Sequence, residues 1–223
     1  MVTKIKVLAK SNRHFRSIVL KIRNYREKHG YNSGNNNRII NHGIKVDCRI
    51  LIKGNNNTVS IDDHAVLKNC TIRINGNHAA IHLKKKSYSE GTTFFIEDDY
   101  CTITVGESTF IGPSHLAATE NHSSISIGDH CMFSSNINLR TGDSHAIIDL
   151  GSGTRINRAQ SISIGDHCWI GEGAKILKGV TLERDVIVAT GSVVTQSFPS
   201  NVLLGGIPAK VLRSDVTWKE DRF

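Results

Sequence analysis

One apolar residue stands at every sixth position between residues 164 and 195 of this 223-residue chain. The positions of this series are Ile164, Ile170, Ile176, Leu182, Val188 and Val194. Small or β-branched residues stand four positions after the first five of them: Cys168, Ala174, Val180, Val186 and Ser192. Neither the helical period of 3.6 nor the strand period of 2 keeps the sixth position apolar through successive steps. The pattern instead predicts a stacked β-solenoid, in which each six-residue unit is one short strand and one turn.

The same period returns in weaker form earlier in the chain, with Asn-rich corners at residues 34–37 and 54–57. Two stretches interrupt it, residues 84–100 and residues 140–160, and we expect both to leave the solenoid. The sequence therefore predicts a mainly β fold. Its solenoid domain covers residues 32–213, with loop insertions near 84–100 and 140–160, and residues 214–223 form a short tail.

A basic amphipathic helix is expected in the N-terminal segment, residues 1–31. Apolar residues recur at helical spacing between residues 11 and 28, with Lys and Arg between them: Phe15, Ile18, Val19, Ile22 and Tyr25. One role for this segment is a cap on the open first coil, because solenoids need capped ends. A second role is peripheral contact with an anionic membrane or a polyanionic polymer. The two roles are compatible.

The net charge of +8 belongs to this segment alone. Residues 1–31 hold nine Lys or Arg and one acid, which leaves 19 basic and 19 acidic residues in the rest of the chain. A neutral solenoid argues against nucleic acid as a partner, since a basic stripe along the body would be needed. The start of the chain lacks the apolar run of a signal peptide, and no stretch approaches membrane-spanning length.

The five cysteines are widely spaced and form no CxxC pair, so neither a zinc site nor a disulfide framework is indicated. Reduced cysteines favour a cytoplasmic location, which includes the inner face of the membrane if the basic segment binds lipid. Among the eleven histidines, His64, His130 and His167 occupy the same turn position of three related units, so we interpret them as structural and expect no metal.

His145 differs because it lies inside the second interruption, with Asp143 and Asp149 nearby in sequence. An imidazole is the side chain best suited to take a proton from an alcohol at neutral pH. Either carboxylate could orient the ring, as in other pairs of a base and its orienting acid. A histidine that merely caps a turn of the loop is the alternative.

Three segments of the second half resemble the hexapeptide-repeat acyltransferases, whose fold is a left-handed parallel β-helix. They are residues 164–174 (IGDHCWIGEGA), residues 188–195 (VATGSVVT) and residues 206–210 (GIPAK). Within that group, residues 141–149 (TGDSHAIID), followed by Arg155-Ile-Asn and Trp169, resemble bacterial capsule and polysialic acid O-acetyltransferases.

The resemblance implies an acetyl-CoA-dependent O-acetyltransferase that acts on a bacterial surface polysaccharide such as capsule, O-antigen or polysialic acid. His145 would act as general base and Trp169 as its functional partner. The resemblance also assigns contacts with acetyl-CoA to four positions: Gly171, Ala189, Thr195 and Lys210. Gln196 stands where many members of the group carry a basic residue, which weakens one expected phosphate contact. The group consists of homotrimers with active sites between subunits.

Two other readings remain open at this point. In one, the donor is the same but the acceptor is a small molecule, such as a sugar nucleotide amine, serine or an antibiotic. In the other, the solenoid has no acetyl-transfer activity and serves as a scaffold or a metal protein. The sequence does not identify the sugar or the hydroxyl group.

Overall fold

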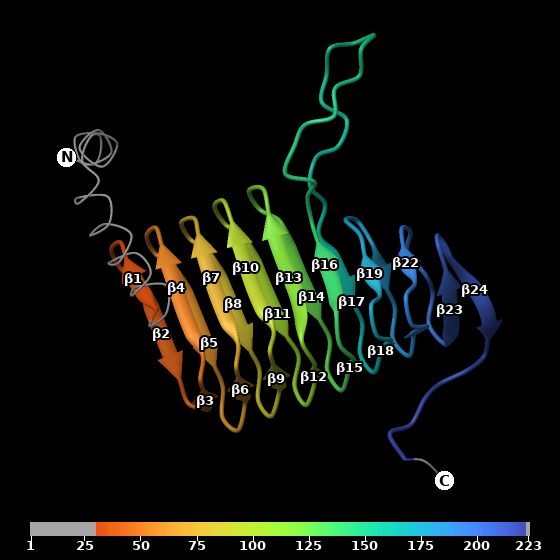
Figure 1. Cartoon of the computed structure of the whole chain (residues 1–223), viewed down its shortest axis with the longest axis horizontal. Coiled ribbons are helices and arrows are strands. Elements are labelled where there is room, and N and C mark those ends of the chain that lie inside the picture. Colours follow the sequence, from red (N-terminus) through yellow and green to blue (C-terminus); the bar gives the residue numbers. More distant parts are fainter. Residues whose placement is uncertain (1–29, 222–223) are drawn as a thin grey trace, which may run out of the picture.

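The computed structural model describes residues 30–221, which wind into a solenoid with three sheets along its sides (Figure 1). The helical segment predicted within residues 1–31 lies outside the described residues, except that the first strand already begins at Tyr31. Every coil places one strand in each sheet, and strands of successive coils pair in parallel. The predicted mainly β fold with a parallel β-helix is therefore confirmed. The described residues contain no helix that is long and apolar enough to cross a membrane.

We call the three sheets A, B and C, in the order in which each coil meets them. Sheet A contains β1 (Tyr31–Ser33), β4 (Arg49–Lys53), β7 (Thr71–Asn75), β10 (Thr93–Glu97), β13 (Ser114–Thr119), β16 (Ile137–Arg140), β19 (Lys175–Ile176) and β22 (Val193–Val194). Sheet B contains β2 (Arg38–Asn41), β5 (Thr58–Ile61), β8 (Ala80–Leu83), β11 (Thr102–Val105), β14 (Ser124–Ile127), β17 (Ile162–Ile164) and β20 (Thr181–Leu182). Sheet C contains β3 (Ile44–Val46), β6 (Val66–Lys68), β9 (Tyr88–Glu90), β12 (Phe110–Ile111), β15 (Met132–Phe133), β18 (Trp169–Ile170), β21 (Ile187–Val188), β23 (Val202–Gly206) and β24 (Ala209–Ser214).

The core is a stack of aliphatic side chains from all three sheets. All six apolar positions of the 164–195 series are buried, as are the small residues that follow them, so the six-residue pattern correctly identified the inward positions. Each coil adds one layer, in which Ile164 pairs with Leu182 in sheet B and Ile170 with Val188 in sheet C. Burial of each such side chain contributes about 1.5–3 kcal/mol, so the stack itself is the main source of stability.

Coil length changes along the solenoid. Thr71 pairs with Thr93 in sheet A, a coil of 22 residues, whereas Lys175 pairs with Val193, a coil of 18 residues. The loop insertion predicted near residues 84–100 is wrong. This stretch holds β9 and β10, and each of these strands pairs with neighbours on both sides. The longer coil breaks the six-residue count in the sequence without breaking the stack.

The repeated histidines lie on the corner between sheets B and C, as expected of turn residues. His64, His130 and His167 all have positive φ angles, between 53° and 59°. We expected them on coils that are not adjacent, but His130 and His167 are on neighbouring coils, since β15 pairs directly with β18. The His167 ring bonds Asp185 (Nδ1 to Oδ1, 2.7 Å), which is a structural contact.

The chain ends in an antiparallel hairpin, because β24 turns back along β23 at the edge of sheet C. The segment after β24 then folds back toward the solenoid, where Val216 N donates to Asn201 O at 3.1 Å. Part of the expected tail is thus packed against the coils.

Candidate functional site

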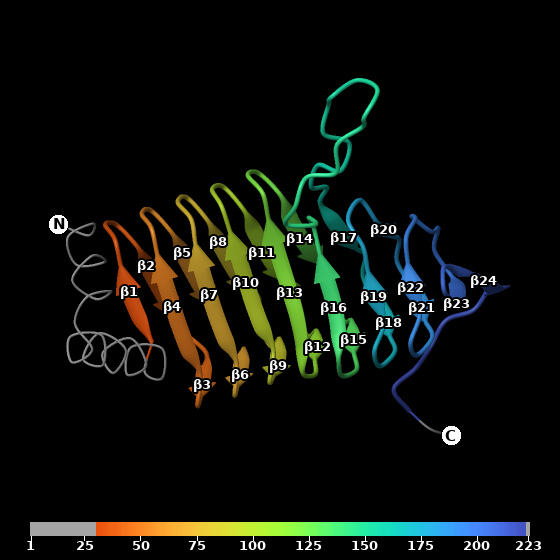
Figure 2. The same cartoon turned by 45° about the horizontal axis from the view of Figure 1, so that its top comes forward.

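Residues 141–161 leave the solenoid between β16 and β17 and project as a long loop from the corner between sheets A and B (Figures 1 and 2). The register break predicted near residues 140–160 falls on this loop. At its base, Thr141 Oγ1 donates to Thr119 O at 3.0 Å and accepts from Thr119 N at 2.8 Å. Gln160 N donates to Thr141 O at 2.9 Å, so the two ends of the loop are tied together and the stack continues past them.

Asn157 organises the interior of the loop, and its side chain is buried. Its Oδ1 accepts from Ile147 N at 2.7 Å and from Arg155 Nε at 3.1 Å. Its Nδ2 donates to Asp143 Oδ2 and to His145 O, both at 2.8 Å. One amide therefore fixes the backbone on both sides of His145 and connects the outgoing and returning halves of the loop.

Two ion pairs fasten the loop to the solenoid. Arg155 donates to the Glu120 carboxylate through both terminal nitrogens, at 2.9 and 2.5 Å, and Glu120 belongs to the corner after β13. These hydrogen bonds hold the pKa of Glu120 below its ordinary value. Lys178, which follows β19, bonds the Asp143 carboxylate and lowers its pKa in the same way. The base of the loop is thus a charged network that spans three coils.

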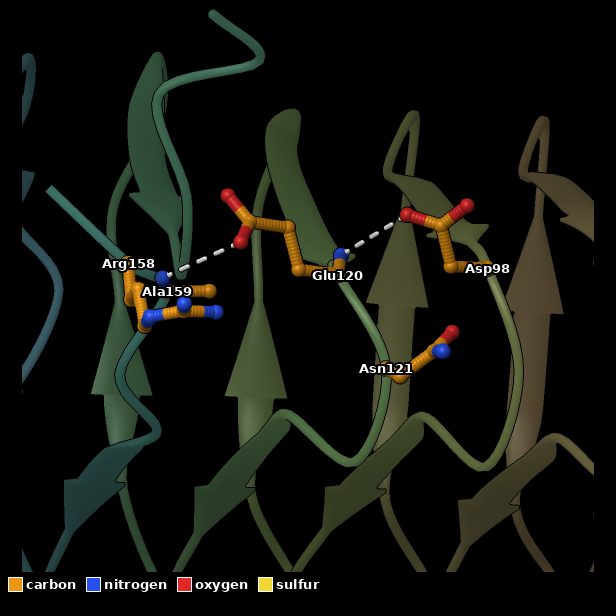
Figure 3. Close-up of a pocket in the computed structure, with 5 residues that line it drawn as sticks. All are labelled: Asp98, Glu120, Asn121, Arg158 and Ala159. Atoms are coloured by element: carbon orange, nitrogen blue, oxygen red, sulfur yellow. Dashed lines mark hydrogen bonds between the residues drawn. The ribbon is translucent and has the colours of Figure 1, made fainter. Parts of the chain in front are cut away.

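Two pockets flank this network, with volumes of about 400 and 420 Å³. His145 lines the first, together with Glu97, Asp98, Thr119, Glu120, Ser144, Ala146 and Arg155. Figure 3 shows the second, where Glu120 lies between Ala159 and Asp98. Glu120 accepts from Ala159 N through its carboxylate and donates to Asp98 through its backbone N–H. Asp98 and Glu120 line both pockets, which are therefore adjacent.

His145 itself is exposed, and none of the described residues bonds its imidazole. Neither expected carboxylate orients the ring. Asp143 is held by Lys178 and Asn157, and Asp149 Oδ1 accepts from Ser152 N at 2.7 Å and from Ser152 Oγ at 2.8 Å. The backbone of His145 is fixed while both ring nitrogens stay open to a bound molecule.

Trp169 lies elsewhere, at the start of β18 on the outer face of sheet C, where it is 41% exposed. The His145 pocket contains no residue of sheet C. In both views the loop projects from the side of the solenoid opposite the row of β6, β9, β12 and β15 (Figures 1 and 2). One chain therefore does not bring the two expected functional residues together. In the described residues no group of three His, Cys, Asp or Glu side chains converges as a metal site would require.

The four positions assigned to acetyl-CoA divide between two corners. Gly171 and Ala189 follow β18 and β21 on the corner between sheets C and A, and Lys210 pairs with Gly205 just beyond them. Thr195 follows β22 and lies on the next corner. Packing alone explains Gly171, because a Cβ there would lie 2.7 Å from Val188 O. The exposed Lys210 ammonium is the one side chain of the four whose charge suits a nucleotide phosphate.

Sequence reasoning missed Glu120, Asn157 and Trp218. Arg155-Ile-Asn was noted as part of a motif, but its role as the clamp of the loop depends on Glu120, 35 residues away. No local signal in the sequence connects these two positions.

The fold and the repeat define the class of protein. Residues 161–196 match the model of the bacterial transferase hexapeptide (six repeats). The resemblance to hexapeptide-repeat transferases is thereby confirmed for the coils that carry the regular pattern.

Solved structures extend the likeness to the whole solenoid. The polysialic acid O-acetyltransferase OatWY is 28% identical, with a TM-score of 0.84 over 87% of this chain and 92% of that chain. The polySia-specific acetyltransferase NeuO is 26% identical, with a TM-score of 0.79 over 86% and 88%.

Curated relatives match over the later coils. The polysialic acid O-acetyltransferase of Escherichia coli O1:K1 / APEC is 31% identical over 94 residues, 42% of this chain and 31% of that protein. The galactoside O-acetyltransferase of Lactococcus lactis is 31% identical over 90 residues, 40% of this chain and 42% of that protein. The matched parts thus span less than half of these relatives.

Proposed function

We propose that this protein is an O-acetyltransferase that moves the acetyl group of acetyl-CoA to a hydroxyl of a bacterial surface polysaccharide. The observation that carries the proposal is the likeness to two polysialic acid O-acetyltransferases along nearly the whole solenoid, far beyond the hexapeptide match. The lipopolysaccharide biosynthesis O-acetyl transferase WbbJ of Escherichia coli, 33% identical over 95 residues, points to the same class of acceptor.

The His145 pocket suits a hydroxyl-rich acceptor. Glu97 and Asp98 offer carboxylate oxygens that accept hydrogen bonds from sugar hydroxyls, and the imidazole nitrogens are free of partners among the described residues. His145 takes the proton of the attacking hydroxyl, the hydroxyl oxygen forms a bond to the thioester carbonyl carbon, and the C–S bond then breaks. The proton held by His145 passes to the departing thiolate, so histidine is restored at the end of each turnover.

Direct transfer fits the state of the cysteines. Burial raises the pKa of the Cys70 thiol to about 12, and hydrogen bonding with Cys131 together with burial raises the pKa of Cys168. The four cysteines after Cys48 are all buried in the core. A buried protonated thiol is a poor nucleophile, so an acyl-enzyme is not needed and the acceptor attacks acetyl-CoA itself.

The active site is completed in this proposal by a second copy of the chain within a homotrimer. His145 and Trp169 lie apart in one chain, and both stand beside exposed apolar surface. On the loop this surface is formed by Ile147, Ile148, Leu150 and Ile156. On sheet C the outward positions in register are Ile44, Val66, Tyr88, Phe110, Met132 and Trp169. Apolar surface of this extent is typical of an interface.

Mixed oligomers test this arrangement. His145→Ala and Trp169→Ala chains are each expected to be inactive alone. Joint refolding at equal amounts should restore about a quarter of wild-type activity, because that share of interfaces combines an intact histidine with an intact tryptophan. A mixture as inactive as its components, in oligomers shown by mass to be mixed, would place both residues in one chain's site or remove one of them from the mechanism.

An acceptor screen tests the activity itself. Acetyl-CoA is offered with capsular and O-antigen polysaccharides, with short oligosaccharides, and with small acceptors such as galactosides and serine. The galactoside O-acetyltransferase relative makes a small saccharide the main competing acceptor. We expect release of coenzyme A only with polysaccharide, and loss of that release in His145→Ala with the oligomer and melting temperature unchanged. Turnover retained in this variant would overturn the assignment of the base.

The cytoplasmic location and the membrane role of residues 1–31 remain predictions. Deletion of residues 1–28 should lower activity on polymer or on vesicle-bound acceptor more than on a short oligosaccharide. Equal loss on both, together with poor solubility, would instead support a plain cap.

A further inference from the structure

The segment after β24 carries the second tryptophan of the chain back onto the solenoid. Trp218 is 7% exposed, and its Nε1–H donates to His167 O at 2.8 Å. Its ring lies flat on the His167 imidazole, with centroids 4.6 Å apart and an angle of 10° between the planes. Hydrogen bonding and stacking together fix both the position and the tilt of this indole.

His167 is a firm base for that stack because it is itself anchored. Its Nδ1 bonds Asp185 Oδ1 at 2.7 Å, and the same oxygen accepts from Thr217 Oγ1 at 3.0 Å. Arg184 Nε donates to the other oxygen at 2.9 Å. Burial opposes ionisation of Asp185, yet the bonds from His167 and Thr217 hold its pKa below its ordinary value. The residue beside Trp218 thus ties the segment to the next coil.

Trp169 follows His167 by two positions, and its exposed indole meets the edge of this assembly. The ring centroids of Trp169 and Trp218 are 6.1 Å apart, with an angle of 46° between the planes, which is a tilted aromatic pair. In sheet C, Trp169 has Met132 on one side and Ile187 on the other, in register. Both are flexible or aliphatic side chains, so among the described residues Trp218 is the rigid lateral support of the Trp169 ring.

We infer that Trp218 is a positioning residue for Trp169: the C-terminal segment holds the Trp169 indole in the orientation that acetyl transfer requires. This inference rests on the proposed function, since it assumes that Trp169 takes part in the reaction. A ring that is free to rotate on an open sheet face occupies many orientations, and small misplacements of a contributing group reduce the rate strongly.

Tryptophan content makes the test direct, because Trp169 and Trp218 are the two tryptophans of the chain. In Trp218→Leu and Trp218→Phe, fluorescence therefore reports Trp169 alone. We expect acrylamide to quench Trp169 more readily in Trp218→Leu than in Trp218→Phe, whose ring still stacks on His167. We also expect kcat to fall about tenfold in Trp218→Leu with a smaller change in KM for acetyl-CoA, and to recover largely in Trp218→Phe.

Thr217→Val is the matched control, because it removes the other bond of the segment to Asp185 and leaves Trp218 in place. Its kcat should stay close to that of the wild type. Equal quenching in the two Trp218 variants, or an unchanged kcat in Trp218→Leu, would overturn the inference. A fall in kcat of the same size in Thr217→Val would reduce Trp218 to a structural role. A wild-type protein without acetyl transfer would refute the proposed function instead, which is a distinguishable result.

Discussion

Asn157→Ala tests whether the fixed backbone of the projecting loop is what makes His145 effective. The substitution removes the four side-chain hydrogen bonds of a buried amide, to Ile147 N, Arg155 Nε, Asp143 Oδ2 and His145 O. A net value of about 0.5–1.5 kcal/mol for each bond gives a loss of about 2–6 kcal/mol. The loss falls on the loop, since none of these four partners contributes to the core of the solenoid.

The expected result is a local opening with an intact solenoid. Hydrogen exchange over residues 141–161 should speed up in Asn157→Ala, while exchange in sheets A, B and C and the melting temperature stay unchanged. The kcat for acetyl transfer should fall by tenfold or more, on the order expected for a displaced base.

Ser152→Ala is the matched control in the same loop. It removes the bonds between Ser152 Oγ and Asp149, which contact neither His145 nor Asn157. A wild-type kcat in Asn157→Ala despite rapid exchange in the loop would refute the reasoning, because the base would then work without a fixed backbone. An equal loss in Ser152→Ala would show that any weakening of the loop matters and that Asn157 has no special part.

Further predictions concern acid and packing. The pKa of Glu120 and that of Asp143 are lowered by their bonds to Arg155 and Lys178, so the clamp contributes stability above the ordinary values of 4.5 and 3.8 and loses it as the pH falls below them. Hydrogen exchange in the loop should therefore increase selectively in that acid range, and exchange that does not depend on pH there would contradict the clamp. Gly171→Ala should lower stability by about 1–3 kcal/mol in urea unfolding, because its Cβ meets backbone at 2.7 Å, and an unchanged midpoint would contradict the close packing of these coils.

The regular coils are predictable from the sequence because each inward position repeats locally. The series from Ile164 to Val194 identified buried positions without knowledge of the neighbouring coils. The same counting failed at residues 84–100, where coils of 22 residues keep the stack but not the six-residue spacing. Pairing between coils, not spacing within them, decides whether a stretch belongs to the solenoid.

The candidate site was only partly predictable. His145 was identified because it lies where the repeat fails, but Asp143 and Asp149 were the wrong partners to consider. The network that holds the loop joins Glu120 to Arg155 across 35 residues and Lys178 to Asp143 across another 35. Contacts of this length depend on which corners stack on each other, and no local pattern records that.

The sequence by itself determined the parallel β-helix, the inward positions of its later coils and the presence of one histidine outside the repeat. Periodicity suffices there because every unit of a solenoid buries the same face against the next unit. The tertiary structure alone decided that His145 and Trp169 lie on different parts of one chain, that Asn157 fixes the loop, and that Trp218 returns to support Trp169. These relations depend on the three-dimensional winding of the coils, which brings distant residues together and keeps nearer ones apart.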